Sequence, residues 1–246
     1  MIEQTVEIPT RDGKVTTFVV HPDRDGPHPI ILFFMDAPGI REELRDMARR
    51  IAAVGYYVML PNLYYRKGVM ELADLPPLPE AEARARMFEL MGSINIPMVM
   101  DDADALLDFA GRDPAASPGR AGAIGYCMSG QYAINVAARH PERIACAASL
   151  YGVQLVTDRP DSPHLAAKKC GAELYFACAE HDTYAPLEMV EALDASLKDR
   201  SAKAEVEIYR GVHHGFAFPQ RGAVYDKPAA ERHWQRLFAL FARNLT

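Results

Sequence analysis

The chain has 246 residues, of which 49% are hydrophobic and 24% are charged, the composition of an ordinary soluble globular protein. This composition excludes a disordered chain, a collagen-like repeat and a small disulfide-stapled domain. The formal net charge is −6 and the chain has no basic tract, so we expect neither nucleic acid nor an anionic membrane as a partner. The longest apolar runs have the length of strands and fall far short of a membrane span.

The first residues have no basic region, apolar stretch or cleavage site of the secretory kind, so we expect a cytoplasmic protein. The spacing of the four cysteines matches no C-x-x-C metal or redox motif. In a reducing compartment we therefore expect free thiols at Cys127, Cys146, Cys170 and Cys178.

Strand-length apolar runs alternate with helical patterns along the whole chain. Residues 5–8 and 14–21 predict an opening antiparallel pair, joined by a turn at Arg11-Asp12-Gly13. The other predicted strands are 29–35, 56–60, 121–126, 144–151, 174–179 and 204–209. The predicted helices are 41–54, 98–110, 128–139, 187–198 and 229–243. This order predicts a single α/β domain over residues 1–246, with a mainly parallel sheet and helices on both of its faces.

Residues 66–93 interrupt this alternation. They contain a proline-rich stretch at 75–79, followed by a charged helical pattern at 80–90. The segment is either a long surface connection or a cap over a site, since loops of this length in compact domains are often lids.

Residues 121–130 carry the strongest chemical signal, because Cys127 lies where a buried strand runs into a helix. A nucleophile on such a turn projects at the sheet edge, near a helix N-terminus that favours an anion. The backbone N–H of Met128 could then stabilise an oxyanion, and a small residue such as Gly125 relieves the strain of the turn. Glycine-rich turns also bind phosphates, but the chain has no G-x-G-x-x-G or Walker lysine here. Ser129 is a competing nucleophile, although its hydroxyl would more often cap or pack.

Three motifs resemble those of one known family. Residues 125–130 resemble its cysteine elbow G-Y-C-x-G-G, with Ser129 in place of the first of the two glycines. Residues 179–186 resemble its acid loop G-x-x-D-x-x-x-P, and residues 211–216 resemble its histidine loop H-G-F. The family is that of the dienelactone hydrolases, and the resemblance covers nearly the whole chain. It implies the α/β-hydrolase fold, whose order of nucleophile, acid and histidine matches this chain.

The resemblance implies a catalytic triad. Cys127 would be the nucleophile, His214 its general base and the acid for the leaving alkoxide, and Asp182 would orient the imidazole. We prefer His214 to His213 because His214 directly precedes Gly215 and Phe216. We expect no cofactor and no metal, since the histidines and aspartate that could ligate zinc are better explained by the triad and its neighbours.

Asp36 ends the apolar strand 29–35 and begins a Pro-Gly turn. In the resembling family a glutamate here controls the ionisation of the cysteine, so Asp36 would modulate Cys127, although it is one methylene shorter. A turn-initiating aspartate is an equal alternative. In this fold the same loop supplies the second oxyanion donor, so the backbone N–H groups of Ala37 and Met128 would form the oxyanion hole.

One departure from the family concerns the substrate. The dienelactone enzymes carry a carboxylate-binding arginine four residues after the catalytic histidine, and this chain has Phe218 there. An aromatic ring cannot replace a bidentate guanidinium, so we expect a less charged or more apolar ester or lactone. Tyr126, Phe218 and Arg66 are candidate substrate contacts, and the aromatic residues could equally be core.

The predicted function is hydrolysis of a small carboxylic ester or lactone through an acyl-cysteine intermediate, by a monomer or small homo-oligomer. One alternative is a thioesterase or acyltransferase that uses the same triad. Another is a non-catalytic binding protein on this fold, which the presence of Cys127, Asp182 and His214 together argues against.

Overall fold

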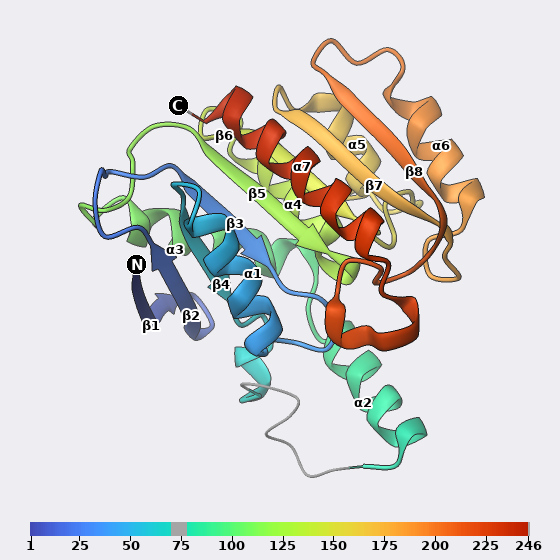
Figure 1. Cartoon of the computed structure of the whole chain (residues 1–246), viewed down its shortest axis with the longest axis horizontal. Coiled ribbons are helices and arrows are strands. Elements are labelled where there is room, and N and C mark those ends of the chain that lie inside the picture. Colours follow the sequence, from blue (N-terminus) through green and yellow to red (C-terminus); the bar gives the residue numbers. More distant parts are fainter. Residues whose placement is uncertain (70–77, 246) are drawn as a thin grey trace. The chain divides into compact units, whose positions relative to one another are not determined.

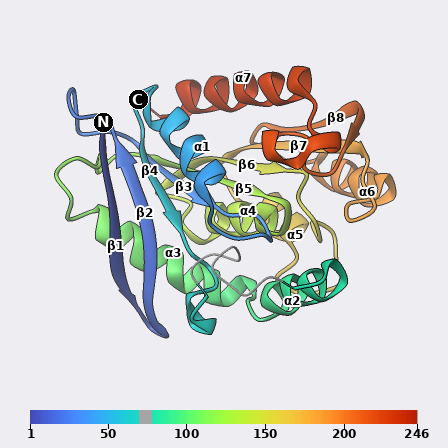
Figure 2. The same cartoon turned by 60° about the horizontal axis from the view of Figure 1, so that its bottom comes forward.

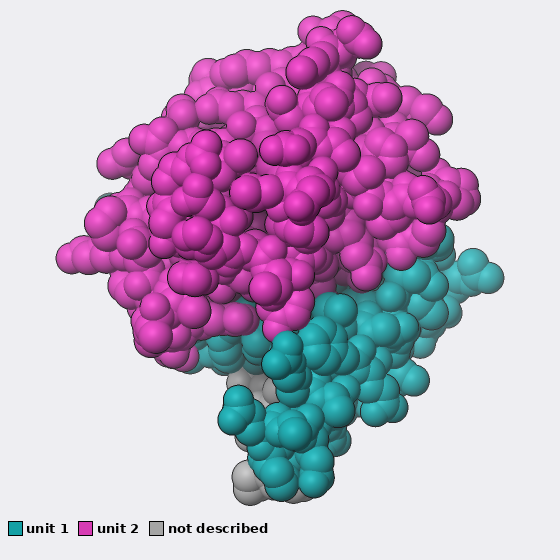
Figure 3. Space-filling view, turned by 90° about the vertical axis from the view of Figure 1, so that its right-hand side faces the viewer, with its two compact units in different colours: residues 1–118 teal, residues 119–246 magenta. Residues whose placement is uncertain are grey.

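A computed structural model describes residues 1–69 and 78–245 of the chain. These residues divide into two compact units, residues 1–118 and residues 119–246 (Figure 3). The single domain predicted for residues 1–246 stays a prediction, and each unit is described by itself.

The first unit begins with the antiparallel pair that the sequence predicts, β1 (Ile2–Thr10) and β2 (Gly13–His21). Strand β2 also pairs antiparallel with β4 (Tyr57–Pro61), which pairs in parallel with β3 (Ile30–Phe34). The helical segments of this unit are α1 (Glu42–Ala52), η1 (Tyr65–Lys67), α2 (Glu80–Gly92) and α3 (Ile96–Ala110). Helices α1 and α3 cover opposite faces of these strands (Figures 1 and 2).

The strands of the second unit are all parallel and follow one another in chain order. They are β5 (Ala121–Tyr126), β6 (Ile144–Leu150), β7 (Glu173–His181) and β8 (Ala204–His213). Its helical segments are η3 (Cys127–Ser129), α4 (Gly130–Arg139), α5 (Pro163–Lys169), α6 (Leu187–Leu197), η4 (Pro219–Val224) and α7 (Lys227–Asn244). Helix α7 covers one face of these strands, and α4 and α5 cover the other (Figures 1 and 2). The predicted α/β class is confirmed.

Burial explains why these segments form strands. Every residue of β5 and β6 is buried, as expected for parallel strands that are covered on both faces. Because the strands of the second unit are parallel, their carboxyl ends lie at the same edge. Polar and reactive residues that follow these ends therefore meet there.

Helix α7 shows how local sequence sets an element's start. The side chain of Asp226 accepts a hydrogen bond from the backbone N–H of Ala229, which satisfies one free donor of the first turn. The apolar side chains of Trp234, Leu237 and Phe241 are buried, as their helical spacing predicts. Helix α5 was not predicted, since its seven residues are too few to show a periodic pattern.

The segment predicted as a connection or a cap is only partly described. Its charged pattern forms α2, whose one buried residue is Leu90. Residues 70–77, which include part of the proline-rich stretch, lie outside the described residues, so the cap stays a prediction. Over the described ranges, no helix has both the length and the apolar character needed to cross a membrane.

Candidate active site

Cys127 lies at the carboxyl end of β5, in the short turn that leads into α4. Its φ is +55°, a left-handed conformation that a non-glycine residue rarely adopts and that is typical of strained functional turns. The carbonyl oxygen of Cys127 accepts hydrogen bonds from the backbone N–H groups of Val153, at 3.1 Å, and Gly130. These bonds hold the peptide whose N–H belongs to Met128, and Cys127 as a residue is partly exposed.

Glycines make this turn sterically possible. A Cβ on Gly125 would lie 2.0 Å from the carbonyl oxygen of Ser129. A Cβ on Gly130 would lie 2.2 Å from Oγ of Ser149 and 2.7 Å from Cα of Gly152. Strand β5 and helix α4 therefore approach their neighbours at distances that only glycine permits. Ser129, the competing nucleophile, is fully buried.

Asp182 and His214 follow the ends of the neighbouring strands β7 and β8. Nδ1 of His214 donates a hydrogen bond to Oδ2 of Asp182 at 2.7 Å. The other carboxylate oxygen, Oδ1, accepts from the backbone N–H groups of Tyr184 and Ala185 at 2.9 and 3.0 Å. Asp182 is thereby fixed on both oxygens and orients the imidazole ring. His213, by contrast, is exposed on the surface beside His181.

The environment of His214 favours its protonated form. Burial by itself lowers the pKa of His214, but hydrogen bonding and charge from Asp182 and Cys127 outweigh it and raise the pKa to about 9. Nε2 is buried and has no hydrogen bond of ordinary geometry within the described part of the chain. The contact with the Cys127 thiol is therefore looser than a standard hydrogen bond.

Aromatic side chains surround this histidine. The rings of Tyr151 and Tyr184 each lie edge-on to His214, with centroids 5.1 Å away. Tyr151 also packs against Phe216 and Phe218. Neither Tyr151 nor Tyr184 was predicted as a site residue, although both lie close to strand ends, where a site is expected.

Two predicted substrate contacts, Tyr126 and Phe218, are buried and pack on each other with ring centroids 5.3 Å apart. The hydroxyl of Tyr126 lies 3.0 Å from Nε2 of the buried His233, whose Nδ1 is hydrogen-bonded to the carbonyl oxygen of Ala230. Since Nδ1 must donate to that carbonyl, Nε2 accepts and the Tyr126 hydroxyl donates. These contacts favour a structural role for both residues, and their contact with substrate stays a prediction.

Asp36 and Ala37 belong to the first unit. The Asp36 carboxylate is buried and accepts hydrogen bonds from both Nη groups of Arg41, at 2.6 and 3.2 Å. The carbonyl oxygen of Ala37 accepts a hydrogen bond from the hydroxyl of Tyr64 at 2.7 Å. The predicted roles of Asp36 on Cys127 and of the Ala37 N–H in an oxyanion hole stay predictions.

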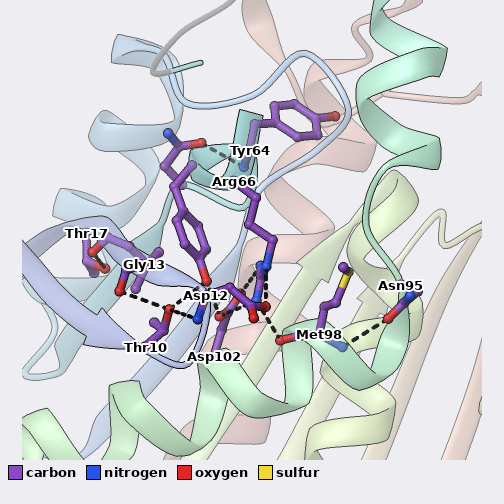
Figure 4. Close-up of polar contacts among 12 residues, drawn as sticks. Thr10, Asp12, Gly13, Thr17, Tyr64, Arg66, Asn95, Met98 and Asp102 are labelled. Atoms are coloured by element: carbon purple, nitrogen blue, oxygen red, sulfur yellow. Dashed lines mark hydrogen bonds and ion pairs between the residues drawn. The ribbon is translucent and has the colours of Figure 1, made fainter. Parts of the chain in front are cut away.

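The guanidinium of Arg66, the third predicted substrate contact, is held by carboxylates of the first unit (Figure 4). Both of its Nη groups donate hydrogen bonds to the buried carboxylate of Asp102 at 2.8 Å, and its Nε donates one to Asp12 at 2.8 Å. Burial raises the pKa of Asp102, and its bonds to Arg66 and Tyr65 oppose that effect. This arrangement favours a role for Arg66 in anchoring the segment after β4, and its contact with substrate stays a prediction.

Within the described ranges, no three His, Cys, Asp or Glu side chains are grouped so that they could hold a metal ion. The site therefore combines the thiol of Cys127, the imidazole of His214 and the carboxylate of Asp182. The backbone N–H of Met128 lies next to the thiol, just before helix α4. Such a set can form and break an acyl bond to sulfur.

Comparison with known protein sequences relates this chain to the dienelactone hydrolases. Residues 15–245 match the model of the dienelactone hydrolase family. A Salmonella typhi protein named "Putative carboxymethylenebutenolidase" is 28% identical, over 96% of this chain and 85% of its own length. A Synechocystis protein of the same name is 26% identical over 98% of this chain and 96% of its own length.

Solved structures agree with the sequence relatives. A crystal structure of a "Putative Dienelactone Hydrolase" from Klebsiella pneumoniae matches with a TM-score of 0.85, at 26% identity over 98% of both chains. Dienelactone hydrolase from Anabaena variabilis has the same fold, with a TM-score of 0.70 at 18% identity over 100% of this chain and 99% of its own. The chain has the α/β-hydrolase fold and belongs to the dienelactone hydrolase family of hydrolases.

Proposed function

We propose that this protein hydrolyses small carboxylic esters or lactones through a Cys127–His214–Asp182 triad. The observation that carries the proposal is the 2.7 Å bond from His214 to Asp182, on an imidazole whose pKa the Cys127 thiol also raises. The match to the dienelactone hydrolase family supports the same chemistry.

In the first half of the reaction, the thiolate of Cys127 attacks the acyl carbon and a C–S bond forms. The carbonyl electron pair moves to the oxygen, where the N–H of Met128 stabilises the developing charge. When this intermediate collapses, the C–O bond breaks and His214 donates its proton to the leaving alkoxide.

In the second half, water attacks the acyl-cysteine and gives its proton to His214. The C–S bond breaks, which releases the carboxylic acid and restores the thiolate. Asp182 remains ionised throughout and stabilises the imidazolium that holds the proton. A raised histidine pKa suits this cycle, because the proton is already on His214 when the thiolate attacks.

The proposal is tested with a panel of short aryl esters, lactones and thioesters. The variants are Cys127→Ala, His214→Gln, Asp182→Asn and Ser129→Ala, with Cys170→Ala as the control for loss of a buried thiol. We expect the first three substitutions to lower kcat by about a thousandfold or more, and the last two to leave it within a few fold.

The outcomes separate the candidate functions. Turnover that survives in Cys127→Ala and disappears in Ser129→Ala would overturn the cysteine mechanism. A strong preference for thioesters, or transfer to an acceptor other than water, would favour the thioesterase or acyltransferase alternative. Rapid alkylation of Cys127 by iodoacetamide without turnover of any substrate would count against hydrolysis of these esters.

A further inference from the structure

Helix α7 brings a buried imidazole to the residue that precedes the proposed nucleophile. His233 is fully buried, and its Nε2 accepts a hydrogen bond at 3.0 Å from the hydroxyl of Tyr126, which directly precedes Cys127. Nδ1 of His233 is hydrogen-bonded to the carbonyl oxygen of Ala230 in the same helix. The two ring nitrogens therefore tie helix α7 to the end of strand β5. The proposed triad does not use this histidine.

The same imidazole contacts the loop that carries the proposed general base. The ring of Phe216, two residues after His214, lies edge-on to His233 with centroids 6.3 Å apart. The carbonyl oxygen of Phe216 also accepts a hydrogen bond at 3.1 Å from the backbone N–H of Asp226, the residue that caps α7. Because Phe216 is fully buried, these contacts with α7 fix the course of the loop beside His214.

Tyr126 is held at both of its ends. Its backbone pairs with Leu150 in the β5–β6 ladder, and its hydroxyl is held by His233. Its ring is fully buried and packs on Phe218. The next residue, Cys127, has the left-handed φ of +55°, a conformation that persists only where the surrounding structure enforces it. The bond from Tyr126 to His233 is part of that surrounding structure.

An imidazole is a costly side chain for packing alone. An apolar side chain of similar volume would fill the same space without the desolvation of two ring nitrogens. A buried hydrogen bond has a preferred direction, so it can select one arrangement where apolar contacts would allow several. At His233 the selected arrangement is that of the end of β5 relative to the histidine loop.

We propose that His233 is a positioning residue for the proposed hydrolase. Through Tyr126 and Phe216 it fixes the distance between the nucleophile turn and the histidine loop. The inference rests on the proposed function and deepens it. Nε2 of His214 makes no hydrogen bond of ordinary geometry within the described residues, so a small displacement is enough to weaken its contact with the Cys127 thiol.

The test uses two amide substitutions that separate the roles of the ring nitrogens. His233→Gln keeps an acceptor near the position of Nε2, within reach of the Tyr126 hydroxyl. His233→Asn keeps a donor near the position of Nδ1 but is too short to reach Tyr126. Tyr126→Phe removes the same bond from its other end. The control is Tyr175→Phe, which removes a buried hydroxyl of β7 that is bonded to Glu207 and Tyr209, each at 2.8 Å.

We expect Tyr126→Phe and His233→Asn to lower kcat for 4-nitrophenyl esters by about tenfold, with KM within about threefold, because a misplaced nucleophile slows the chemical step rather than binding. The double variant should be no slower than either single one, since both remove one bond. His233→Gln should recover most of kcat. Tyr175→Phe should keep kcat within about twofold, although it also loses stability in urea.

Two results would overturn the inference. One is a Tyr126→Phe protein with the kcat of wild type, and the other is a Tyr175→Phe protein that slows as much as Tyr126→Phe. Fluorescence of Trp234, the one tryptophan of the chain, verifies that α7 stays packed in each variant, because its ring lies 4.7 Å from that of His233.

Alkylation of Cys127 by iodoacetamide tests the inference without any ester. A thiol beside a protonated histidine reacts at lower pH than an ordinary thiol. We therefore expect the pH profile of alkylation to move to higher pH in Tyr126→Phe and His233→Asn, and to stay in place in Tyr175→Phe. If wild type hydrolyses no ester, the proposed function fails and this profile decides the inference. A profile that is the same in all four proteins would overturn it.

Discussion

The tight turn at Cys127 gives the most demanding prediction, the effect of Gly125→Ala. The added Cβ would lie 2.0 Å from the carbonyl oxygen of Ser129, 2.5 Å from its carbonyl carbon and 3.0 Å from the nitrogen of Gly130. All three atoms belong to the backbone, so no side-chain rotation can relieve the overlap. To restore an ordinary contact, the start of α4 must move by more than about 1 Å relative to β5.

The magnitude follows from this displacement. Overpacking of a buried site costs about 1–3 kcal/mol of unfolding free energy, and a backbone overlap belongs at the upper end of that range. A shift of about 1 Å at the nucleophile also lowers the reaction rate by about a hundredfold, which corresponds to about 2.7 kcal/mol of activation free energy. We therefore expect both stability and ester hydrolysis to fall.

Gly171→Ala is the matched control in the same unit. In the described structure no atom lies within 4 Å of a Cβ at Gly171, and its φ is not left-handed, so the substitution should be neutral or stabilise by up to about 1 kcal/mol. Urea denaturation, 4-nitrophenyl ester hydrolysis and the rate of Cys127 alkylation are measured on both variants. A Gly125→Ala protein with the denaturation midpoint and activity of the wild type would refute the steric argument.

Three further predictions concern stability. The pKa of His214 is about 9 when folded and about 6.5 when unfolded, so its contribution to stability, up to about 3 kcal/mol, should be complete below pH 6.5 and lost as the pH rises through 9. Urea unfolding from pH 6 to 9.5 should reveal this slope, which His214→Gln should flatten; an unchanged slope would contradict it. Tyr126→Phe removes a buried hydrogen bond and should lower the unfolding free energy by about 1–3 kcal/mol, whereas a purely apolar role would leave the denaturation midpoint unchanged. Asp102→Ala leaves the Arg66 guanidinium without its buried partner and should cost about 3–5 kcal/mol in urea unfolding, against less than about 1 kcal/mol for Asp12→Ala, so equal costs would argue against the anchor.

The sequence was most informative where steric or periodic constraints are local. The strand at 121–126 and its turn were predictable, because a fully apolar run that ends in small residues has few other structures. The ends of β7 and β8 extend further than predicted, to His181 and His213, since polar residues that pair at a strand end carry no apolar signal.

The partners of charged residues were not predictable. Arg66 lies 36 residues from Asp102 in the chain, and nothing in its local sequence distinguishes an arginine held by a buried aspartate from one that meets a substrate. Asp36 presents the same difficulty, because its bidentate contact with Arg41 depends on the course of the turn between them. Spacing alone does not reveal which charges a fold brings together.

The division of the proposed triad among three strand ends has a consequence for synthesis on the ribosome. Translation from residue 127 to residue 214 takes roughly 4 to 17 seconds at about 5–20 residues per second. During that interval the growing chain lacks His214, and without this histidine Cys127 keeps the reactivity of an ordinary cysteine. The proposed activation of Cys127 by His214 therefore waits until β8 has been made and has joined β7.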